Sequence, residues 1–158
     1  MYGLAVSSRT GTVDPVTLTE AKAHLRVDGT AEDTYITDLI SAASLTIEDM
    51  QAKVFRQASM TLTLDHWPSG DLIIPRYPVS SVTSITYLEE GESTPTTFAS
   101  TNYLVDTARM PPRIVLKKDK LWPTASLEAG PSITVTFVAG YADGAVPEPA
   151  KHAIKFLV

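Results

Sequence analysis

The sequence predicts an α+β fold, in which a small helical bundle carries an inserted antiparallel β-sheet or barrel lobe. Apolar residues recur every three to four positions up to about residue 55, alternate with period two over about 56–140, and return to helical spacing from about 146. Because the strands are grouped between helices, this order favours α+β over alternating α/β. We predict one domain over residues 1–158, with its helical core at about 14–55 and 146–158 and its β lobe at about 56–140.

The first helix is expected in "TLTEAKAHL", after an extended N-terminal arm that closes at Asp14 and Pro15. Thr17 and Glu20 have the three-residue spacing of a capping box, in which each side chain accepts the backbone amide of the other residue. Gly29 in "RVDGT" is available for the left-handed backbone that commonly follows a helix.

The second helix, in "TAEDTYITDLISAASLTIEDMQAKVF", has the clearest periodicity in the chain. Thr30 is the expected N-cap, and Glu32 and Asp33 suit the positive end of the helix dipole. Glu48 and Asp49 fall on the polar face, where we expect solvated charges. One wide apolar face extends over roughly six turns and makes this helix the predicted spine of the core. Its members are Ile36, Leu39, Ile40, Ala43, Ile47, Met50 and Val54.

The segment after Phe55 has the alternation of β-strands. "QASMTLTLDHW" and "SITVTFVAG" alternate apolar residues with threonine, and "DLIIP", "VSSVTSITYLEE", "TTFASTNYLVD" and "RIVL" lie between turn signals. Roughly five to seven short strands are expected. Pro147 and Pro149 then open a last helix, and the helices from the two ends of the sequence must meet to share a core. That helix has an apolar stripe of Ala150, Ile154, Leu157 and Val158.

Composition excludes several classes of protein. Cysteine is absent, so disulfides, thiolate metal sites and a cysteine nucleophile are excluded. No stretch approaches the roughly 18 apolar residues of a membrane span, and the N-terminal residues lack the pattern of a signal peptide. The net charge of −5 disfavours a general binder of nucleic acid or of an anionic membrane, because such binding needs clustered Lys and Arg.

The search for an active site is negative. The sequence has no phosphate-binding glycine loop, dinucleotide fingerprint or nucleophile elbow. Glu148 and His152 have a spacing that more often gives a solvated side-chain pair than a metal site. Asp65 and His66 adjoin on a strand and point to opposite faces, and His24 lies in another segment. We predict no catalytic residue, no cofactor and no metal; an enzyme would need Asp65, His66 and Glu148 to converge in a cleft.

One basic cluster occurs in "RIVLKKDKLWP". It contains Lys117, Lys118 and Lys120, with Trp122 close by. A basic loop beside an aromatic ring can bind nucleic acid by charge and stacking, can contact another protein, or can be a plain solvated loop. An aspartate interrupts the cluster and the chain as a whole is acidic, so the nucleic-acid interpretation is the weakest of the three.

Two further features are expected to have structural roles and no chemical function. Glu89, Glu90 and Gly91 have the pattern of a hairpin tip with solvated charges. Trp67 and Trp122 each precede a proline and are expected to be hydrophobic anchors of the β lobe.

The opening "VTLTEAKAHLRVDGTAEDTYITDLISAASLTIEDM" resembles the head–tail connector (adaptor, or head-completion) proteins of long-tailed double-stranded DNA phages. That family begins with a short helix of the type L-x-E-A-K-x-H-L-R-V/I, followed by an Asp/Gly break, an acidic N-cap and a long apolar helix. "LIIPRYPVSSVTSITYL" and "VTFVAGYADGAVPEPAKHAIKFLV" are similar to its strand–proline–strand segment and to its closing strand, glycine turn and helix. The matching positions of the opening are Leu18, Glu20, Ala21, Lys22, His24, Leu25, Arg26, Val27, Asp33, Ile36, Leu39, Ile40, Ala42 and Ala43.

The resemblance spans about residues 14–158 and implies a virion structural protein that catalyses nothing. Such proteins form a ring, usually of about twelve copies, under the portal of the filled capsid. The ring extends the DNA channel and docks the next neck, stopper or tail protein. Twelve copies at −5 would carry about −60 formal charges, so DNA would pass through the channel without specific binding. The implied location is the virion neck, and the host cytoplasm during assembly, where free subunits can be monomeric.

The resemblance also implies where partners bind. The helix at the C-terminal end is the usual portal-facing element, and family members usually continue it for another turn or more, so we expect it to extend beyond Val158 in the complete protein. The candidate portal-contact residues are Lys151, Ile154, Lys155, Leu157 and Val158. The candidate contacts to a neighbouring subunit or neck protein are Lys117, Lys118, Lys120 and Trp122.

Two other functions stay open at this point. A β-rich module that binds carbohydrate or protein would need Trp67, Trp122 and Tyr77 to cluster on an exposed face. A stopper or tail-completion protein would occupy another position in the same neck.

Overall fold

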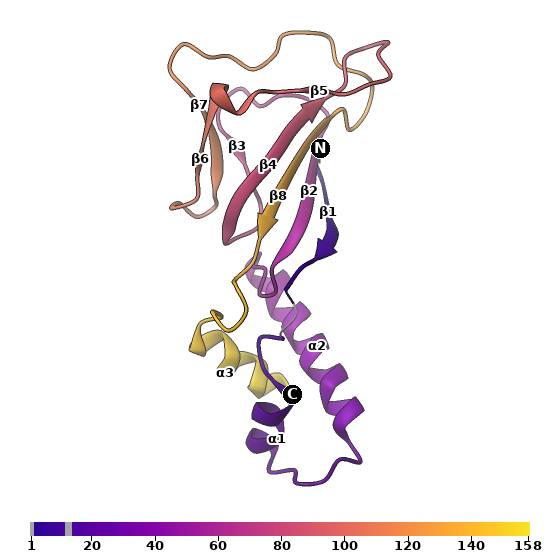
Figure 1. The fold of residues 1–158 in the computed structure, drawn as a ribbon, viewed down its shortest axis with the longest axis vertical. Helices are drawn as coiled ribbons and strands as arrows, with labels where there is room; N and C mark the ends of the chain where they lie inside the picture. Colours follow the sequence, from indigo (N-terminus) through magenta and orange to yellow (C-terminus); the bar gives the residue numbers. More distant parts are fainter. Residues whose placement is uncertain (1, 12–13) are drawn as a thin grey trace. The chain divides into compact units, whose positions relative to one another are not determined.

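Figure 1 shows the computed structural model of the protein, which describes residues 2–11 and 14–158. The chain folds into two compact units, and each unit is built from separate parts of the sequence. The β unit comprises Met1–Ser8 and Ala58–Ala139, and the helical unit comprises Arg9–Gln57 and Gly140–Val158. Helices and antiparallel sheets are therefore both present, which confirms the predicted α+β class.

The described part of the helical unit contains three α-helices. They are α1 (Leu18–Leu25), α2 (Asp33–Gln51) and α3 (Glu148–Leu157). The predicted capping box starts α1: the Glu20 amide donates to Thr17 Oγ1 at 3.2 Å, and the Thr17 amide donates to Glu20 Oε2 at 2.8 Å. The predicted left-handed role of Gly29 is wrong, because Arg26 takes that conformation directly after the helix, with φ 59°. None of the described helices is long and apolar enough to cross a membrane.

Helix α2 begins later than the sequence predicts, and fewer of its apolar side chains are buried. Its N-cap is Glu32, and the expected cap Thr30 contributes only a backbone carbonyl to the Asp33 amide. At the other end Met50 is 80% exposed, because the core of the unit ends at Ile47 and its next member is Phe55.

Glu48 on α2 is buried, so the prediction that it is a solvated charge is wrong. Its carboxylate accepts a hydrogen bond from the backbone amide of Phe55 at 2.5 Å. The chain after α2 therefore turns back over this side chain, and the left-handed Ala52 directly after the helix makes that turn.

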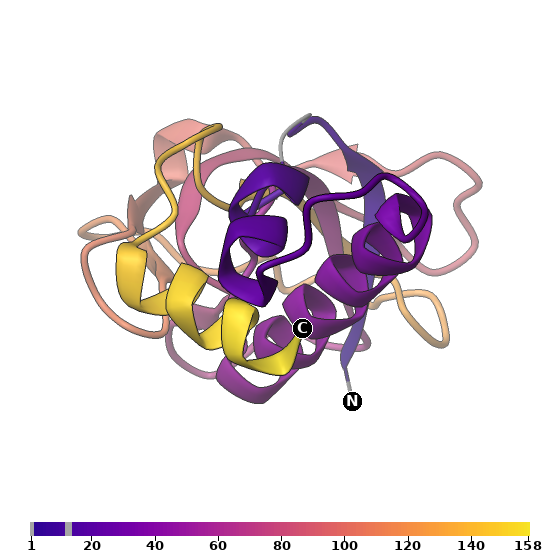
Figure 2. The ribbon, with the colours of Figure 1, turned by 90° about the horizontal axis from the view of Figure 1, so that it is seen from below.

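One hydrophobic core joins the three helices. Pro147 is the residue before α3, as the sequence predicts, and α3 places Ile154 in the same core as the buried stripe of α2. Figure 2 shows α1 and α3 lying beside α2. The helices from the two ends of the sequence therefore share a core, as predicted. Its buried members are Val16, Ala21, Ile36, Ile40, Ala43, Ile47, Phe55, Val146 and Ile154.

The described residues of the β unit form two sheets, which together contain eight strands and so exceed the five to seven expected. The five-stranded sheet has the order β1 (Tyr2–Arg9), β2 (Ala58–Leu64), β8 (Ile133–Ala139), β4 (Val79–Tyr87) and β5 (Thr96–Thr97). The three-stranded sheet has the order β3 (Leu72–Ile73), β7 (Arg113–Leu116) and β6 (Tyr103–Asp106). Most of the extended N-terminal arm is the edge strand β1.

Strands β2 and β8 form the centre of the larger sheet. Their antiparallel register pairs Met60 with Phe137 and Leu62 with Val135, and all four side chains are buried. The alternating threonines of both strands point to the other face. The period-two pattern of the sequence therefore identifies the core face of both strands correctly.

Candidate functional site

The C-terminal turn of α3 presents large apolar side chains to solvent. Phe156 is 78% exposed and Leu157 is 54% exposed, whereas Ile154 is fully buried. Because a helix advances by 100° per residue, Phe156 lies almost opposite Ile154, and the helix is apolar on both sides at this turn. We call Phe156 and Leu157 the α3 apolar tip.

Helix α1 supports the α3 apolar tip from one side. The imidazole of His24 packs edge-on against the ring of Phe156, with ring centroids 5.9 Å apart and an interplanar angle of 86°. The next residue, Leu25, is partly exposed on the same end of α1. The last turn of α1 thus borders the α3 apolar tip through His24.

The charged side chains of α3 interact with one another and with Glu20 of α1. Lys151 Nζ lies 2.9 Å from Glu148 Oε1, and this hydrogen bond is the main cause that raises the pKa of Lys151. The pKa of Glu20 is lowered mainly by the backbone amide of Thr17, and the positive charges of Lys151 and Lys155 lower it further. The carboxylate of Glu20 on α1 is thus within electrostatic reach of two cations of α3.

The candidate portal-contact residues differ in how far their side chains are exposed, and their role stays a prediction. Ile154 packs inside the core and Val158 packs against it, so these two side chains serve the fold. Lys151 is paired with Glu148. Leu157 and Lys155 remain on the surface. Phe156, which sequence reasoning missed, is the most exposed apolar residue of α3; its position two residues after the buried Ile154 was the available signal.

The predicted basic loop follows β7. The Lys120 amide donates to the Lys117 carbonyl at 3.1 Å and closes a tight turn, in which Asp119 has a φ of 61°. Lys118 and Lys120 are exposed, and so is Leu121, at 79%. The loop thus presents two ammonium groups and one apolar side chain to solvent.

Trp122 packs in an aromatic cluster of the β unit. Its indole stacks on Trp67 with ring centroids 4.9 Å apart, and its Nε1 donates to the Gly70 carbonyl at 3.1 Å. Phe98 packs against both indoles. The prediction that both tryptophans are hydrophobic anchors is confirmed. A carbohydrate-binding surface, by contrast, needs their rings to face solvent.

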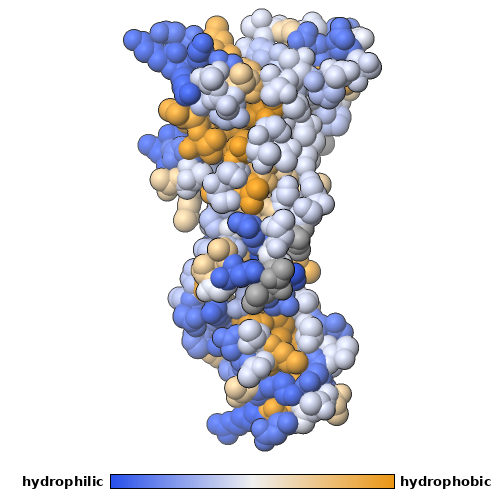
Figure 3. Space-filling model, viewed as in Figure 1, coloured by the Kyte–Doolittle hydropathy of each residue, from blue (hydrophilic) through white to orange (hydrophobic). Residues whose placement is uncertain are grey.

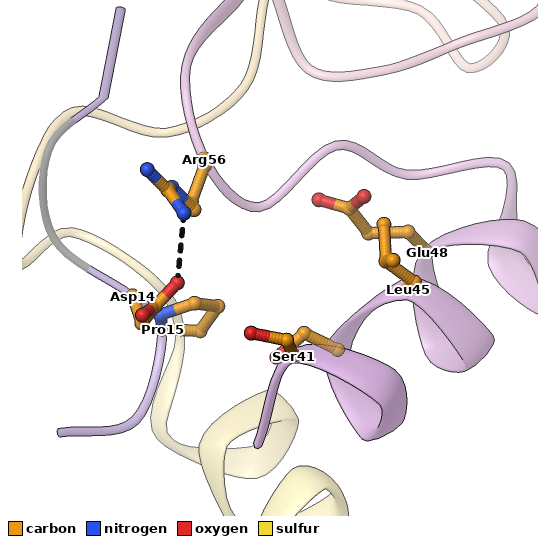
Figure 4. Close-up of a pocket in the computed structure, with 7 residues that line it drawn as sticks. Asp14, Pro15, Ser41, Leu45, Glu48 and Arg56 are labelled. Carbon is orange, nitrogen blue, oxygen red and sulfur yellow. Dashed lines mark hydrogen bonds and ion pairs between the residues drawn. The ribbon is translucent and has the colours of Figure 1, made fainter. Parts of the chain in front are cut away.

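A cavity of about 130 Å³ lies within the helical unit, beside α2. Figure 4 shows the Arg56 guanidinium at one end of it, 3.0 Å from Asp14 Oδ1. Arg56 also donates to the Gly11 carbonyl at 2.9 Å. Ser41 and Glu48 line the side formed by α2. Asp14, Arg56 and Glu48 all bind other groups of the chain. We therefore interpret the cavity as a packing space around Arg56 and not as a ligand site.

The residues weighed for catalysis do not line this cavity. Asp65 and His66 are exposed in the β unit, and Glu148 is exposed in the helical unit, where it pairs with Lys151. Within residues 2–11 and 14–158, no three histidine or acidic side chains lie together as metal ligands would.

Comparison with known proteins gives one family and several similar structures. A family model described as phage gp6-like head-tail connector protein matches residues 15–104. The chain is similar to a protein in the neck of an empty gene transfer agent (GTA) particle computed with C6 symmetry, with 26% identity, 98% of this chain and 80% of that chain covered, and a TM-score of 0.78. No curated protein matches the sequence.

Two further structures have the same fold. A protein in the neck of a native GTA particle computed with C12 symmetry is 25% identical, with 99% of this chain and 80% of that chain covered and a TM-score of 0.73. A protein in the virion of a native GTA particle is 22% identical, with 98% and 80% covered and a TM-score of 0.76.

The family match covers more than half of the chain and includes the two helices and the capping box that carry the sequence resemblance. It continues through β2, β3, β4 and β5 as far as the start of β6. The chain therefore belongs to the phage gp6-like head-tail connector protein family.

Proposed function

We propose that this protein is a structural component of the virion neck, where its copies form a ring that joins the portal to the next neck or tail protein. The observation that carries the proposal is the similarity over nearly the whole chain to two GTA neck proteins. The C6 and C12 symmetries of those necks support an assembly of repeated copies. In this role the two units act together as one connector domain, and no reaction is catalysed.

The α3 apolar tip is the proposed contact with the portal. Exposure of the Phe156 and Leu157 side chains to water is unfavourable, and a partner that covers them removes this exposure. Burial of each large apolar side chain would contribute roughly 1.5–3 kcal/mol to the free energy of binding. Lys155, one residue before Phe156, adds a positive charge to the same turn of the helix. The proposal rests on this exposed surface and on the family membership of the chain.

The other proposed partners follow from the same ring. Copies of the chain contact one another beside the portal, and the basic loop serves a neighbouring copy or neck protein. At −5 per copy, the ring is acidic as a whole, so DNA passes through it without specific binding. The protein resides in the host cytoplasm before it joins the neck.

Co-sedimentation with isolated portal rings tests the proposal. We expect the wild-type chain to pellet with the portal, and the Phe156→Ser/Leu157→Ser variant to bind at least about tenfold more weakly, which corresponds to 1.4 kcal/mol. Met50→Ser is the matched control, because Met50 is equally exposed on α2 and outside the α3 apolar tip. A wild-type chain that stays in the supernatant would contradict the proposal. Binding only to a preassembled portal–adaptor complex would identify a stopper instead.

A further inference from the structure

The β unit has an acidic surface at the turn between β4 and β5, which we call the acidic tip. It consists of Glu89, Glu90, Glu92 and Glu128. Two backbone hydrogen bonds join the turn to the segment that contains Glu128: the Glu90 amide donates to the Ser126 carbonyl at 2.9 Å, and the Glu128 amide donates to the Leu88 carbonyl at 3.1 Å. The Glu128 carboxylate accepts the Gly91 amide at 3.2 Å. These hydrogen bonds hold together the two segments that carry the four glutamates.

Lys117, Lys118 and Lys120 form the basic loop of the same unit. The Lys117 amide donates to the Asn102 carbonyl at 2.9 Å, so this end of the loop is tied to the segment before β6. With its tight turn, the loop presents its ammonium groups from a defined backbone. The exposed Leu121 borders these charges and would be buried by any protein that covers them.

Neither set of charges is balanced within the described subunit. The Arg113 guanidinium in the same unit, by contrast, forms ion pairs with both Asp71 and Asp106. In residues 2–11 and 14–158, no ion pair includes a member of the acidic tip or of the basic loop. The unit therefore carries one negative and one positive surface, each available to a charge of the opposite sign.

The two surfaces lie on opposite sides of the β unit. Figure 3 shows strongly hydrophilic lobes at its upper left and upper right, with apolar surface between them. In Figure 1 the segment after β7 lies at the upper left, and the turn between β4 and β5 lies at the upper right. This placement suits a head-to-tail contact, in which each copy uses two different surfaces and a closing rotation gives a ring.

We infer that the acidic tip of one copy contacts the basic loop of the next copy. The inference rests on the ring proposed above and names the surfaces that join its subunits. The carboxylates of the acidic tip, facing the exposed ammonium groups of Lys118 and Lys120 and the side chain of Leu121, supply charge complementarity with an apolar contact at its edge. Complementary charges of this kind set the orientation and register of a contact and speed its formation.

Charge reversal tests the contact by sedimentation velocity at low ionic strength, where surface charges are least screened. The Lys118→Glu/Lys120→Glu variant has two acidic surfaces. In the Glu90→Lys/Glu92→Lys variant, two lysines stand beside Glu89 and Glu128, so the tip loses its net negative charge and its two reversed positions face the basic loop of the next copy. We expect each variant alone to self-associate about tenfold more weakly than the wild type. An equimolar mixture should recover wild-type association, because the two variants then alternate around the ring.

Asp28→Lys/Asp38→Lys is the matched control for the Glu90→Lys/Glu92→Lys variant, since it makes the same change of charge on exposed residues of the helical unit. It should leave self-association unchanged apart from a general effect of net charge. Wild-type association by both reversed variants, or a mixture no stronger than its components, would overturn the inference.

The absence of cysteine permits a second test, which traps even a weak contact. Under mild oxidation, the Glu90→Cys/Lys118→Cys variant should give a ladder of disulfide-linked multimers, whereas each single-cysteine variant can give only dimers. A double variant that stops at dimers would overturn the inference. Portal co-sedimentation is measured separately. If the disulfide ladder is missing but portal binding is retained, the inferred contact between copies is wrong and the proposed function is unaffected.

Discussion

His24 of α1 lies edge-on to Phe156 of α3, with their ring centroids 5.9 Å apart. This contact fixes the end of a helix from each extremity of the sequence, and it leaves the outer side of the Phe156 ring exposed. The same helix turn thus has one side that stabilises the fold and another that is available to a partner. Substitutions on the two sides should therefore have different effects on stability and on binding.

The outer side is expected to matter for binding and little for folding. Phe156→Ala removes an exposed ring, so we predict a loss of unfolding free energy of about 1 kcal/mol or less. Portal binding should fall about tenfold or more. Urea denaturation and co-sedimentation measure the two effects. A large loss of stability with unchanged binding would show that Phe156 serves the fold alone.

The inner side is expected to behave in the opposite way. Ile154 is fully buried in the core of the helical unit, so Ile154→Ala should reduce the free energy of unfolding by about 2–5 kcal/mol. Urea denaturation followed by far-UV circular dichroism checks this value. A loss below about 1 kcal/mol would contradict the assignment of Ile154 to the core.

Glu20 should make stability depend on pH in the acid range. Its pKa in the folded protein is lower than the ordinary value of 4.5, so its charged form stabilises the fold at neutral pH. This contribution should be complete above pH 4.5 and should be lost as the pH falls through the lower, folded-state pKa. Glu20→Ala should therefore differ most in stability from the wild type at neutral pH. Thermal unfolding of both proteins across pH 2–7 tests this, and a constant difference would contradict it.

Substitution of Glu48 tests the buried hydrogen bond between its carboxylate and the Phe55 amide. Glu48→Ala leaves the Phe55 amide buried without its acceptor, which should cost about 1–3 kcal/mol of unfolding free energy. Glu48→Gln keeps an acceptor oxygen and should cost less. Asp49→Ala is the comparison on the exposed side of the same turn. Equal effects of Glu48→Ala and Asp49→Ala would contradict the structural role of the Glu48 carboxylate.

The features that the sequence predicts well are local in the chain. The capping box needs only Thr17 and Glu20, and the buried stripe of α2 needs only a period that matches the helix. Alternation along β2 and β8 identifies their buried faces for the same reason.

The features that cannot be predicted from the sequence depend on contacts between distant segments, or on backbone conformations that several neighbouring residues could adopt. Burial of Glu48 requires the chain after α2 to bring the Phe55 amide to it. The left-handed residue is Arg26 because the helix ends one turn before the available glycine. The exposed Phe156 could be found only once Ile154 was known to face the core. The order of the strands, with β8 between β2 and β4, needs contacts that no single segment specifies.

Electron microscopy of the protein mixed with portal rings tests the central claim most directly. We predict an annular density added to one end of the portal, with the α3 apolar tip of each copy at the contact. Portal particles that remain bare at saturating protein, under conditions where the protein is folded by circular dichroism, would contradict the assignment of this chain as a portal-docked connector.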